Sequence, residues 1–214
     1  MIAIYGGTFD PIHVGHVHVA RWVLKHLRPR KLVFVPTSQN PHKTAPTPSR
    51  HRLKMVELAV EQMADTRLEV SRIEIDSDGP SYTVNTLTHF SLLHSNLLLV
   101  TGSDTMRSFS KWKSPERILE LANILIVRRD AFDLTLLSQN HRLPAPTENT
   151  ITWGNDRWIR LMDIGAIEIS ATSLRHDIAQ FFRGNIAKTA PQGVQQSVWQ
   201  YIKENRLYTD WQDR

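Results

Sequence analysis

The residues best suited to chemistry gather near the start of the sequence, in the stretch GGTFDPIHVGH that spans residues 6–16. Its paired glycines, Gly6 and Gly7, lack a Cβ and let backbone N–H groups approach a bulky anion. His13 and His16 lie three residues apart, so they share one face in the first turn of a helix. Two imidazoles at the positive end of a helix can hydrogen-bond phosphate oxygens and stabilise charge as phosphorus becomes five-coordinate. The stretch therefore predicts a site for phosphoryl chemistry.

A second phosphate-binding segment is predicted at residues 169–175, ISATSLR. Ser170 is a natural N-cap, and Thr172 adds a hydroxyl where the backbone donors of a first helical turn are unpaired. Arg175 follows about one turn later and can grip a phosphate with its planar fork. A helix start rich in Ser and Thr is commonly only a cap. The arginine, in a chain that already has a phosphate loop, favours a site for the β- and γ-phosphates of ATP.

Three further residues have two interpretations each. Lys43 follows a predicted strand and is either a phosphate-binding cation or an exposed loop lysine. Asp104, in Gly102-Ser103-Asp104, either accepts hydrogen bonds from ribose hydroxyls or caps a helix. Trp112 either stacks on a flat ring or is buried, which is the commoner case for tryptophan.

Short apolar runs and helical periodicity indicate the elements that must position these residues. The runs at 2–5 and 32–35 end at glycine and proline, and between them Val17, Ala20, Leu24 and Leu27 recur at helical spacing. Strand, helix and strand in this order predict a βαβ unit with parallel strands. The alternation continues with predicted strands at 68–70, 97–101, 123–127 and near 159–162, and with predicted helices at 53–63, where Ser49 is the expected cap, at 84–90, and after 170 and 194.

This order predicts an α/β fold, a Rossmann-like open parallel sheet with helices on both faces and a helical C-terminal cap. In such sheets ligands bind beyond the carboxyl ends of the strands, where the first loop lies. We expect one domain over residues 1–214, with the helical C-terminal part at about 170–208. Pro115 is expected to interrupt the helical stretch before the 123–127 strand. Residues 130–150 lack a clear period and are predicted to form a surface excursion.

The composition limits the classes of protein to consider. The 214 residues are 41% hydrophobic and contain no cysteine, which excludes disulfides, thiolate catalysis and cysteine-based zinc sites. No signal-peptide pattern or membrane-spanning run is visible, so a cytoplasmic protein without membrane contact is expected. The formal net charge of +5 favours anionic partners or is a mildly basic surface. Neither a P-loop nor a G-x-G-x-x-G motif occurs, which disfavours P-loop NTPases and hydride-transfer enzymes.

Taken together, these segments resemble bacterial nicotinate-nucleotide adenylyltransferases of the HxGH nucleotidyltransferase superfamily. The resemblance rests on GGTFDPIHVGH and ISATSLR, and on PTSQNPHK (36–43), PSYTVNTL (80–87), TGSDTMRSFSKW (101–112) and the ending PQGVQQSVWQYIKENRLY (191–208). The sequence departs from the family pattern at Asn40, at Lys113 and at Asp130. Residues 130–156 align with nothing in the family.

The resemblance implies a role for each site residue. His13, His16 and Arg175 are implied as catalytic. ATP is expected to contact Gly6, Gly7, Thr8, Phe9, His16, Gly102, Asp104, Ser170, Thr172 and Arg175. The mononucleotide is expected to contact Asp10, Lys43, Thr83 and Trp112, with Thr83 near the nicotinate mononucleotide and Trp112 at its pyridine ring. No metal site built by the protein is expected; Mg²⁺ is expected to be carried on the phosphates of ATP.

The implied activity is transfer of AMP from ATP to nicotinate mononucleotide, which yields deamido-NAD and pyrophosphate in NAD biosynthesis. Nicotinamide-mononucleotide and pantetheine-phosphate adenylyltransferases are the nearest alternatives among enzymes. A non-catalytic nucleotide-binding regulator and a nucleic-acid-binding module are remote alternatives, and the latter predicts salt-sensitive binding to any strand. The expected partners are ATP and the mononucleotide, without nucleic acid, and a homo-oligomer is left open.

Overall fold

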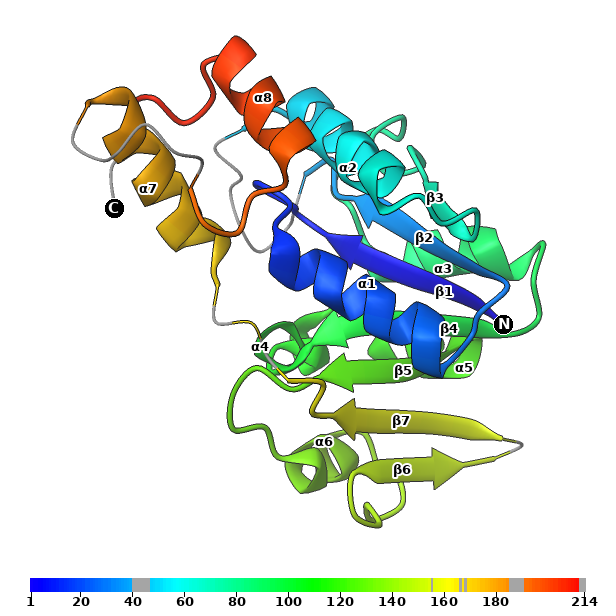
Figure 1. Cartoon of the computed structure of the whole chain (residues 1–214). Coiled ribbons are helices and arrows are strands. Elements are labelled where there is room, and N and C mark those ends of the chain that lie inside the picture. The colour runs from blue at the N-terminus through cyan, green and yellow to red at the C-terminus, as the bar shows by residue number, and fades with distance from the viewer. Residues whose placement is uncertain (40–46, 155, 166, 168, 185–190, 212–214) are drawn as a thin grey trace.

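A twisted seven-stranded sheet runs through the protein (Figure 1). The computed structural model describes residues 1–39, 47–154, 156–165, 167, 169–184 and 191–211. Six strands are parallel, and the edge strand β6 runs antiparallel to β7. The strands are β1 (Ile2–Gly7), β2 (Lys31–Pro36), β3 (Leu68–Val70), β4 (Leu97–Gly102), β5 (Ala122–Val127), β6 (Thr150–Trp153) and β7 (Arg157–Met162).

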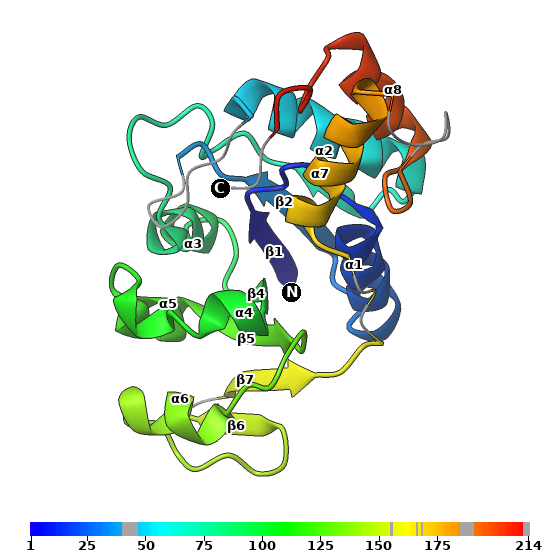
Figure 2. The same cartoon turned by 90° about the vertical axis from the view of Figure 1, so that its left-hand side faces the viewer.

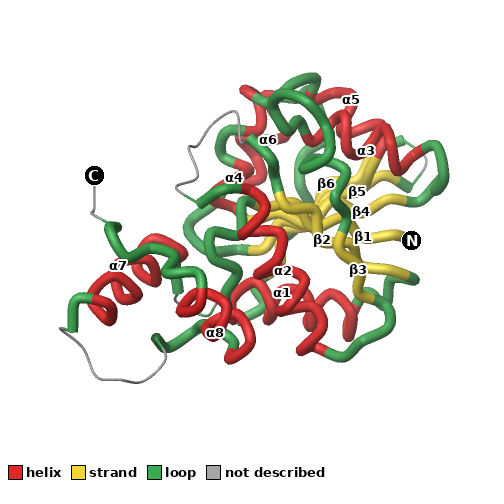
Figure 3. Tube along the Cα trace, turned by 90° about the horizontal axis from the view of Figure 1, so that it is seen from above, coloured by secondary structure: helices red, strands yellow, loops and turns green. Residues whose placement is uncertain are grey.

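Helices cover both faces of this sheet. Seen from above, α1, α2 and α8 lie on one side of the strands and α3, α5 and α6 on the other, while α7 extends past the strand ends (Figure 3). The helices among the described residues are α1 (Val14–His26), α2 (Ser49–Met63), α3 (Thr83–Ser91), α4 (Ser103–Met106), the 3₁₀ turn η1 (Phe109–Lys111), α5 (Pro115–Leu121), α6 (Leu134–Asn140), α7 (Ala171–Phe182) and α8 (Gln196–Glu204). The Rossmann-like architecture predicted from the sequence is confirmed.

Alternation along the strands divides the core into two layers. In β1, Ala3 and Tyr5 pack toward α1, α2 and α8, while Ile2 and Ile4 pack toward α3, α5 and α6. A strand buried on both faces reads as a continuous apolar run, which is why these strands could be recognised from the sequence.

The strand order is β3-β2-β1-β4-β5-β7-β6, so the direction of the chain through the sheet reverses between β1 and β4. The loops after these two strands diverge to opposite faces, and the crevice between them is where open α/β sheets bind ligands. Figure 2, which looks onto the carboxyl ends of the strands, places α3 and α4 on one side of β1 and α1 and α7 on the other. The first loop therefore lies at the switch point.

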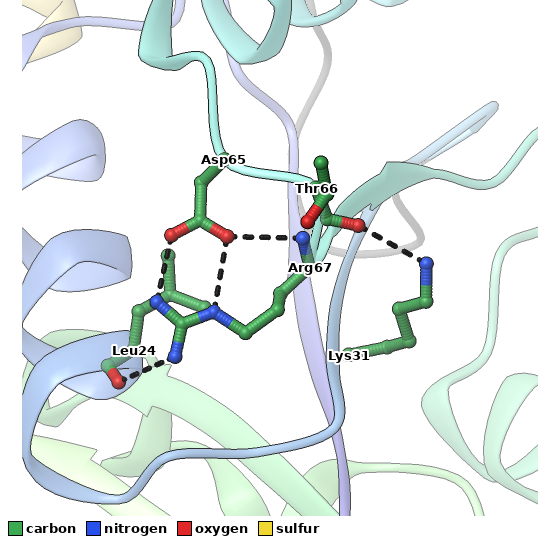
Figure 4. Close-up of polar contacts among 5 residues, drawn as sticks. All are labelled: Leu24, Lys31, Asp65, Thr66 and Arg67. Carbon is green, nitrogen blue, oxygen red and sulfur yellow. Dashed lines mark hydrogen bonds and ion pairs between the residues drawn. The ribbon is translucent and has the colours of Figure 1, made fainter.

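Polar contacts secure the β2–β3 edge of the sheet (Figure 4). The Arg67 guanidinium donates to both carboxylate oxygens of Asp65, at 3.0 and 2.7 Å, and to the carbonyl of Leu24 at 3.1 Å. Lys31 Nζ donates to the carbonyl of Thr66 at 3.1 Å. These bonds tie the start of β2 and the end of α1 to the turn before β3.

Several local predictions were wrong. Residues 130–150 contain a helix, α6, whose Leu134 and Leu137 are buried in the core and whose N-cap Asp133 accepts a hydrogen bond from the Thr135 N–H at 2.7 Å. Two turns are too short to give a recognisable helical period. Ser49 is the first residue of α2 rather than its cap, which is Pro48.

None of the helices among the described residues is long and apolar enough to span a membrane.

Candidate active site

A cavity of about 480 Å³ opens at the switch point of the sheet. Its walls come from the first loop, the end of β4, α4, the residues that flank η1, the segment after β5, the start of α3 and the start of α7. Every site residue proposed from the sequence that the structure describes lines this cavity. Lys43 lies outside the described residues, so its predicted role stays a prediction.

At two positions of the GGTFDPIHVGH stretch, the surroundings explain why the residue is glycine. A Cβ on Gly6 would meet no atom within 4 Å, so this backbone borders open space that a phosphate can approach. A Cβ on Gly15 would lie 3.0 Å from the ring of His13 and 3.2 Å from the side chain of Ile169. Glycine at position 15 thus lets the His13 ring and the segment before α7 pack against the first turn of α1.

The two histidines lie against each other at the start of α1. Their ring centroids are 3.8 Å apart, and Nδ1 of His16 accepts a hydrogen bond from the backbone N–H of His13 at 3.2 Å. Because that nitrogen is an acceptor, a neutral His16 carries its proton on Nε2 and can donate it to a ligand. Burial lowers the pKa of His13 to about 3, and Arg129 adds to the effect. Burial, His13 and Arg129 also hold the pKa of His16 well below its usual value. Both rings are therefore neutral donors before substrate binds.

The low pKa of His13 makes folding stability depend on pH. Below about pH 6.5 the unfolded chain protonates this imidazole, whereas the folded protein keeps it neutral down to about pH 3. The free energy of unfolding should therefore fall as the pH is lowered through this range, with His13 contributing about 1.4 kcal/mol per pH unit. His13→Asn removes the titrating ring, so urea unfolding across this range should give a shallower slope. Equal slopes for the variant and the parent would show that His13 is not held neutral.

The predicted phosphate clamp at the start of α7 consists of a capped helix end and an arginine that is held by two hydrogen bonds. Ser170 Oγ accepts a hydrogen bond from the Ser173 N–H at 3.0 Å, which confirms Ser170 as the N-cap. Arg175 donates from Nη1 to the backbone carbonyl of Asp10 at 2.5 Å and from Nη2 to Thr172 Oγ1 at 3.1 Å. The clamp and the first loop, 165 residues apart in sequence, thus form one wall.

The start of α3 and the segment after η1 carry Thr83 and Trp112, two of the residues predicted to contact the mononucleotide. Thr83 begins α3, whose N-cap Tyr82 makes no side-chain capping bond. The half-buried Trp112 packs against Phe109 and donates from Nε1 to Ser108 at 3.3 Å. The ammonium of Lys113 lies 4.6 Å from the centre of the Tyr82 ring. Burial raises the pKa of Glu74, which also lines the cavity, while hydrogen bonds from Thr86 and Ser81 oppose the shift.

Asp10 is a buried junction whose carboxylate is already engaged. Its Oδ1 accepts from the Tyr208 hydroxyl at 2.6 Å, and its Oδ2 accepts from the Thr47 N–H at 3.3 Å. Arg52, 1% exposed, lies beside it and donates to the carbonyls of Thr8, Ser38 and Thr47. The roles of Arg52 and Tyr208 were not predicted from the sequence, because both depend on contacts between distant segments.

Arg129 is a further residue whose role was not predicted from the sequence. It lines the cavity, its Nη1 lies 3.6 Å from Oδ2 of Asp104, and its charge lowers the pKa of both histidines. Asp104 is in the first turn of α4, whose N-cap is Gly102. The available signal was position: Arg129 lies two residues after the end of β5, at the carboxyl edge of the sheet.

The fold and the cavity define a class of protein. A sheet that reverses at its switch point, with a glycine-histidine loop and an arginine clamp facing one cavity, is the arrangement of a nucleotidyltransferase. Residues 4–177 match the profile of the family described as cytidylyltransferase-like.

Relatives narrow the assignment. A protein of Clostridium tetani named "Probable nicotinate-nucleotide adenylyltransferase" is 34% identical over 82% of this chain and 86% of its own length. A protein of Caldicellulosiruptor bescii with the same name is 30% identical over 97% of this chain and 98% of its own. The chain belongs to the nicotinate-nucleotide adenylyltransferase family. The structure of the Plasmodium falciparum nicotinic acid mononucleotide adenylyltransferase complexed with NaAD shares the fold, with a TM-score of 0.72 and 19% identity over 97% of this chain and 96% of its own.

Proposed function

We propose that this protein transfers AMP from ATP to nicotinate mononucleotide, which yields deamido-NAD and pyrophosphate in NAD biosynthesis. The observation that carries the proposal is that the two predicted phosphate-binding segments and the start of the predicted mononucleotide segment line one and the same cavity. Relatives at 30–34% identity over most of the chain bear the name of this activity.

The proposed chemistry is an in-line displacement at the α-phosphorus of ATP. The 5′-phosphate of the acceptor is already an anion at neutral pH, so it attacks without a general base. The protein must hold two negatively charged reactants together and neutralise the charge that develops. In this account His16 donates from Nε2 to the reacting phosphate, His13 supports it, Arg175 binds the departing pyrophosphate, and Asp104 accepts from the ribose.

We propose that Mg²⁺ is carried on the phosphates of ATP. The described residues contain no group of three or more His, Cys, Asp or Glu side chains able to hold a metal ion. Mg²⁺ commonly keeps several waters and binds through substrate phosphates, and in that role it would neutralise charge on the leaving pyrophosphate. Arg129 and Arg175, two of the cations that line the cavity, would share this task.

Arg175→Ala should weaken the binding of ATP and pyrophosphate at least ~10-fold, because a hydrogen bond to a charged group contributes about 1.5–3 kcal/mol. Arg175→Lys should recover only part of the loss, since an ammonium does not reproduce a two-pronged contact. Titration of each variant with ATP and separately with the mononucleotide measures this, and Arg21→Ala, an exposed site on α1, is the control. Equal weakening of both ligands would place Arg175 elsewhere.

The choice of acceptor is expected to depend on donors at the α3 end of the cavity. Nicotinate offers two anionic oxygens, and nicotinamide replaces one with an NH₂ group. We expect backbone N–H groups at the start of α3, which no side chain caps, to donate to the carboxylate, and the positive end of the helix would favour it. A donor left unpaired against an NH₂ group costs roughly 1–3 kcal/mol.

We therefore expect a preference for nicotinate over nicotinamide mononucleotide of at least ~10-fold in kcat/KM, because 1.36 kcal/mol corresponds to tenfold. Steady-state kinetics with both acceptors at saturating ATP measures it. Lys113→Met tests whether the ammonium beside Tyr82 adds to the preference, with Lys111→Met on η1 as its control. Equal kcat/KM values, or a preference for nicotinamide, would reject the acceptor and leave the adenylyl transfer standing.

A further inference from the structure

The C-terminal segment after α8 returns to the cavity wall and covers the phosphate-clamping arginine. The guanidinium carbon of Arg175 lies 4.2 Å from the centre of the Trp211 ring. Three residues earlier, the Tyr208 hydroxyl donates to Asp10, whose carbonyl accepts from Arg175. The end of the chain is thus joined to Arg175 through both its ring face and its hydrogen-bond acceptor.

The contacts of Arg175 leave part of its fork free for a ligand. Among the described residues Nη1 and Nη2 each donate once, to Asp10 and Thr172, and each carries a second N–H. Nε is buried and finds no acceptor among the described residues. Arg175 lines the cavity, whereas Trp211 is absent from the described residues that line it. The indole lies over one face of the guanidinium and is not itself a wall of the cavity.

Trp211 is itself held in this position. Its backbone N–H donates to the carbonyl of Tyr208 at 3.2 Å, and its own carbonyl accepts from Arg183 Nη2 at 3.0 Å. The indole Nε1 is buried without an acceptor among the described residues. A buried indole usually finds a partner for its N–H. Here the ring gives up that bond and lies over the guanidinium, an arrangement that a cation–π contact stabilises.

We propose that Trp211 is a positioning residue that holds the guanidinium of Arg175 in the plane in which its free N–H groups meet the phosphates of ATP. The proposal rests on the proposed function only in taking those phosphates as the ligand of Arg175. With Asp10 and Thr172 fixing the edge of the fork and Trp211 covering one face, the side chain cannot rotate out of the cavity wall. Less conformational freedom is then lost when ATP binds.

Substitution of Trp211 by Leu and by Phe separates the aromatic face from apolar packing. Trp211→Leu should raise the dissociation constant for Mg-ATP about 3- to 30-fold, the range expected for a partly desolvated cation–π contact. Trp211→Phe keeps a π face and should stay within about threefold of the parent. Calorimetric titration with Mg-ATP, with no acceptor present, measures both. The affinity for nicotinate mononucleotide should not change in either variant.

A double-mutant cycle tests whether Trp211 acts through Arg175. In an Arg175→Ala background, Trp211→Leu should weaken ATP binding no further. Trp158→Leu is the matched control, because it removes a similar contact, with Arg160 at 4.5 Å, between two residues of β7. Its dissociation constant for ATP should equal that of the parent.

Several results would overturn the proposal: unchanged ATP affinity in Trp211→Leu, equal losses for Leu and Phe, an undiminished loss in the Arg175→Ala background, or an equal loss in the Trp158 control. Product formation by the parent protein is measured separately. If the parent binds ATP with the pattern above but makes no dinucleotide, the proposed function fails and the role of Trp211 stands. If the parent makes the dinucleotide and Trp211→Leu binds ATP normally, the proposed function stands and the proposed role of Trp211 fails.

Discussion

Replacing His16 with alanine should lower kcat about 10²- to 10³-fold while raising the KM for ATP only slightly. The neutral imidazole accepts from the His13 backbone through Nδ1, so Nε2 is the donor available for the reacting phosphate. A donor aimed at charge that develops in the transition state lowers the barrier more than it strengthens ground-state binding, and losing one costs about this factor. Initial rates over a range of ATP at saturating nicotinate mononucleotide give both constants.

His18→Ala is the matched control for this experiment. His18 lies on the same helix, its Nε2 contacts the carbonyl of Ile164 at 2.8 Å, and it is absent from the described residues that line the cavity. Its kcat should stay close to that of the parent. A near-normal kcat for His16→Ala, or an effect confined to KM, would assign His16 to binding rather than to the chemical step.

Replacing Arg52 with methionine should lower the free energy of unfolding by about 3–5 kcal/mol, as expected when one member of a buried charged group is removed. The guanidinium donates to the carbonyls of Thr47 at 3.0 Å, Thr8 at 2.7 Å and Ser38 at 2.9 Å. Methionine fills much of the apolar stem but leaves these acceptors, and the nearby carboxylate of Asp10, without their cation. Urea unfolding of both proteins measures the difference.

Arg50→Met, at an exposed position in the same helix, is the control and should change stability by no more than about 0.5 kcal/mol. A similar small change for Arg52→Met would mean that the first loop keeps its shape without the buried arginine. In that case the Arg52 hydrogen bonds could not be what holds Thr8 at the cavity wall.

The sheet could be predicted because its signals are local. The strands β1, β2, β4 and β5 are short apolar runs that end at glycine, proline or a polar residue, and helical periods separate the runs. The reach of such signals also explains the failures. Leu134 and Leu137 mark a two-turn helix, too short for a period, and the β6–β7 hairpin was recognised only in its second strand.

The candidate site was likewise predictable only where its residues form a local sequence motif. The first loop and the arginine clamp are each one continuous stretch of sequence, and both line the cavity as expected. Tyr208 meets Asp10 across 198 residues, and Arg52 reaches backbone carbonyls on three different segments. Such contacts leave no recognisable pattern in a single sequence, because they join residues that are far apart in the chain.

We expect the cavity to join AMP from ATP to a pyridine mononucleotide. The most direct measurement incubates the purified full chain with ATP, Mg²⁺ and, separately, nicotinate mononucleotide, nicotinamide mononucleotide or 4′-phosphopantetheine, and identifies the products by mass. We predict deamido-NAD and an equal amount of pyrophosphate with nicotinate mononucleotide, much slower formation of NAD, and no product with phosphopantetheine. Absence of a dinucleotide with both pyridine mononucleotides, from protein that is folded and binds ATP, would contradict the account.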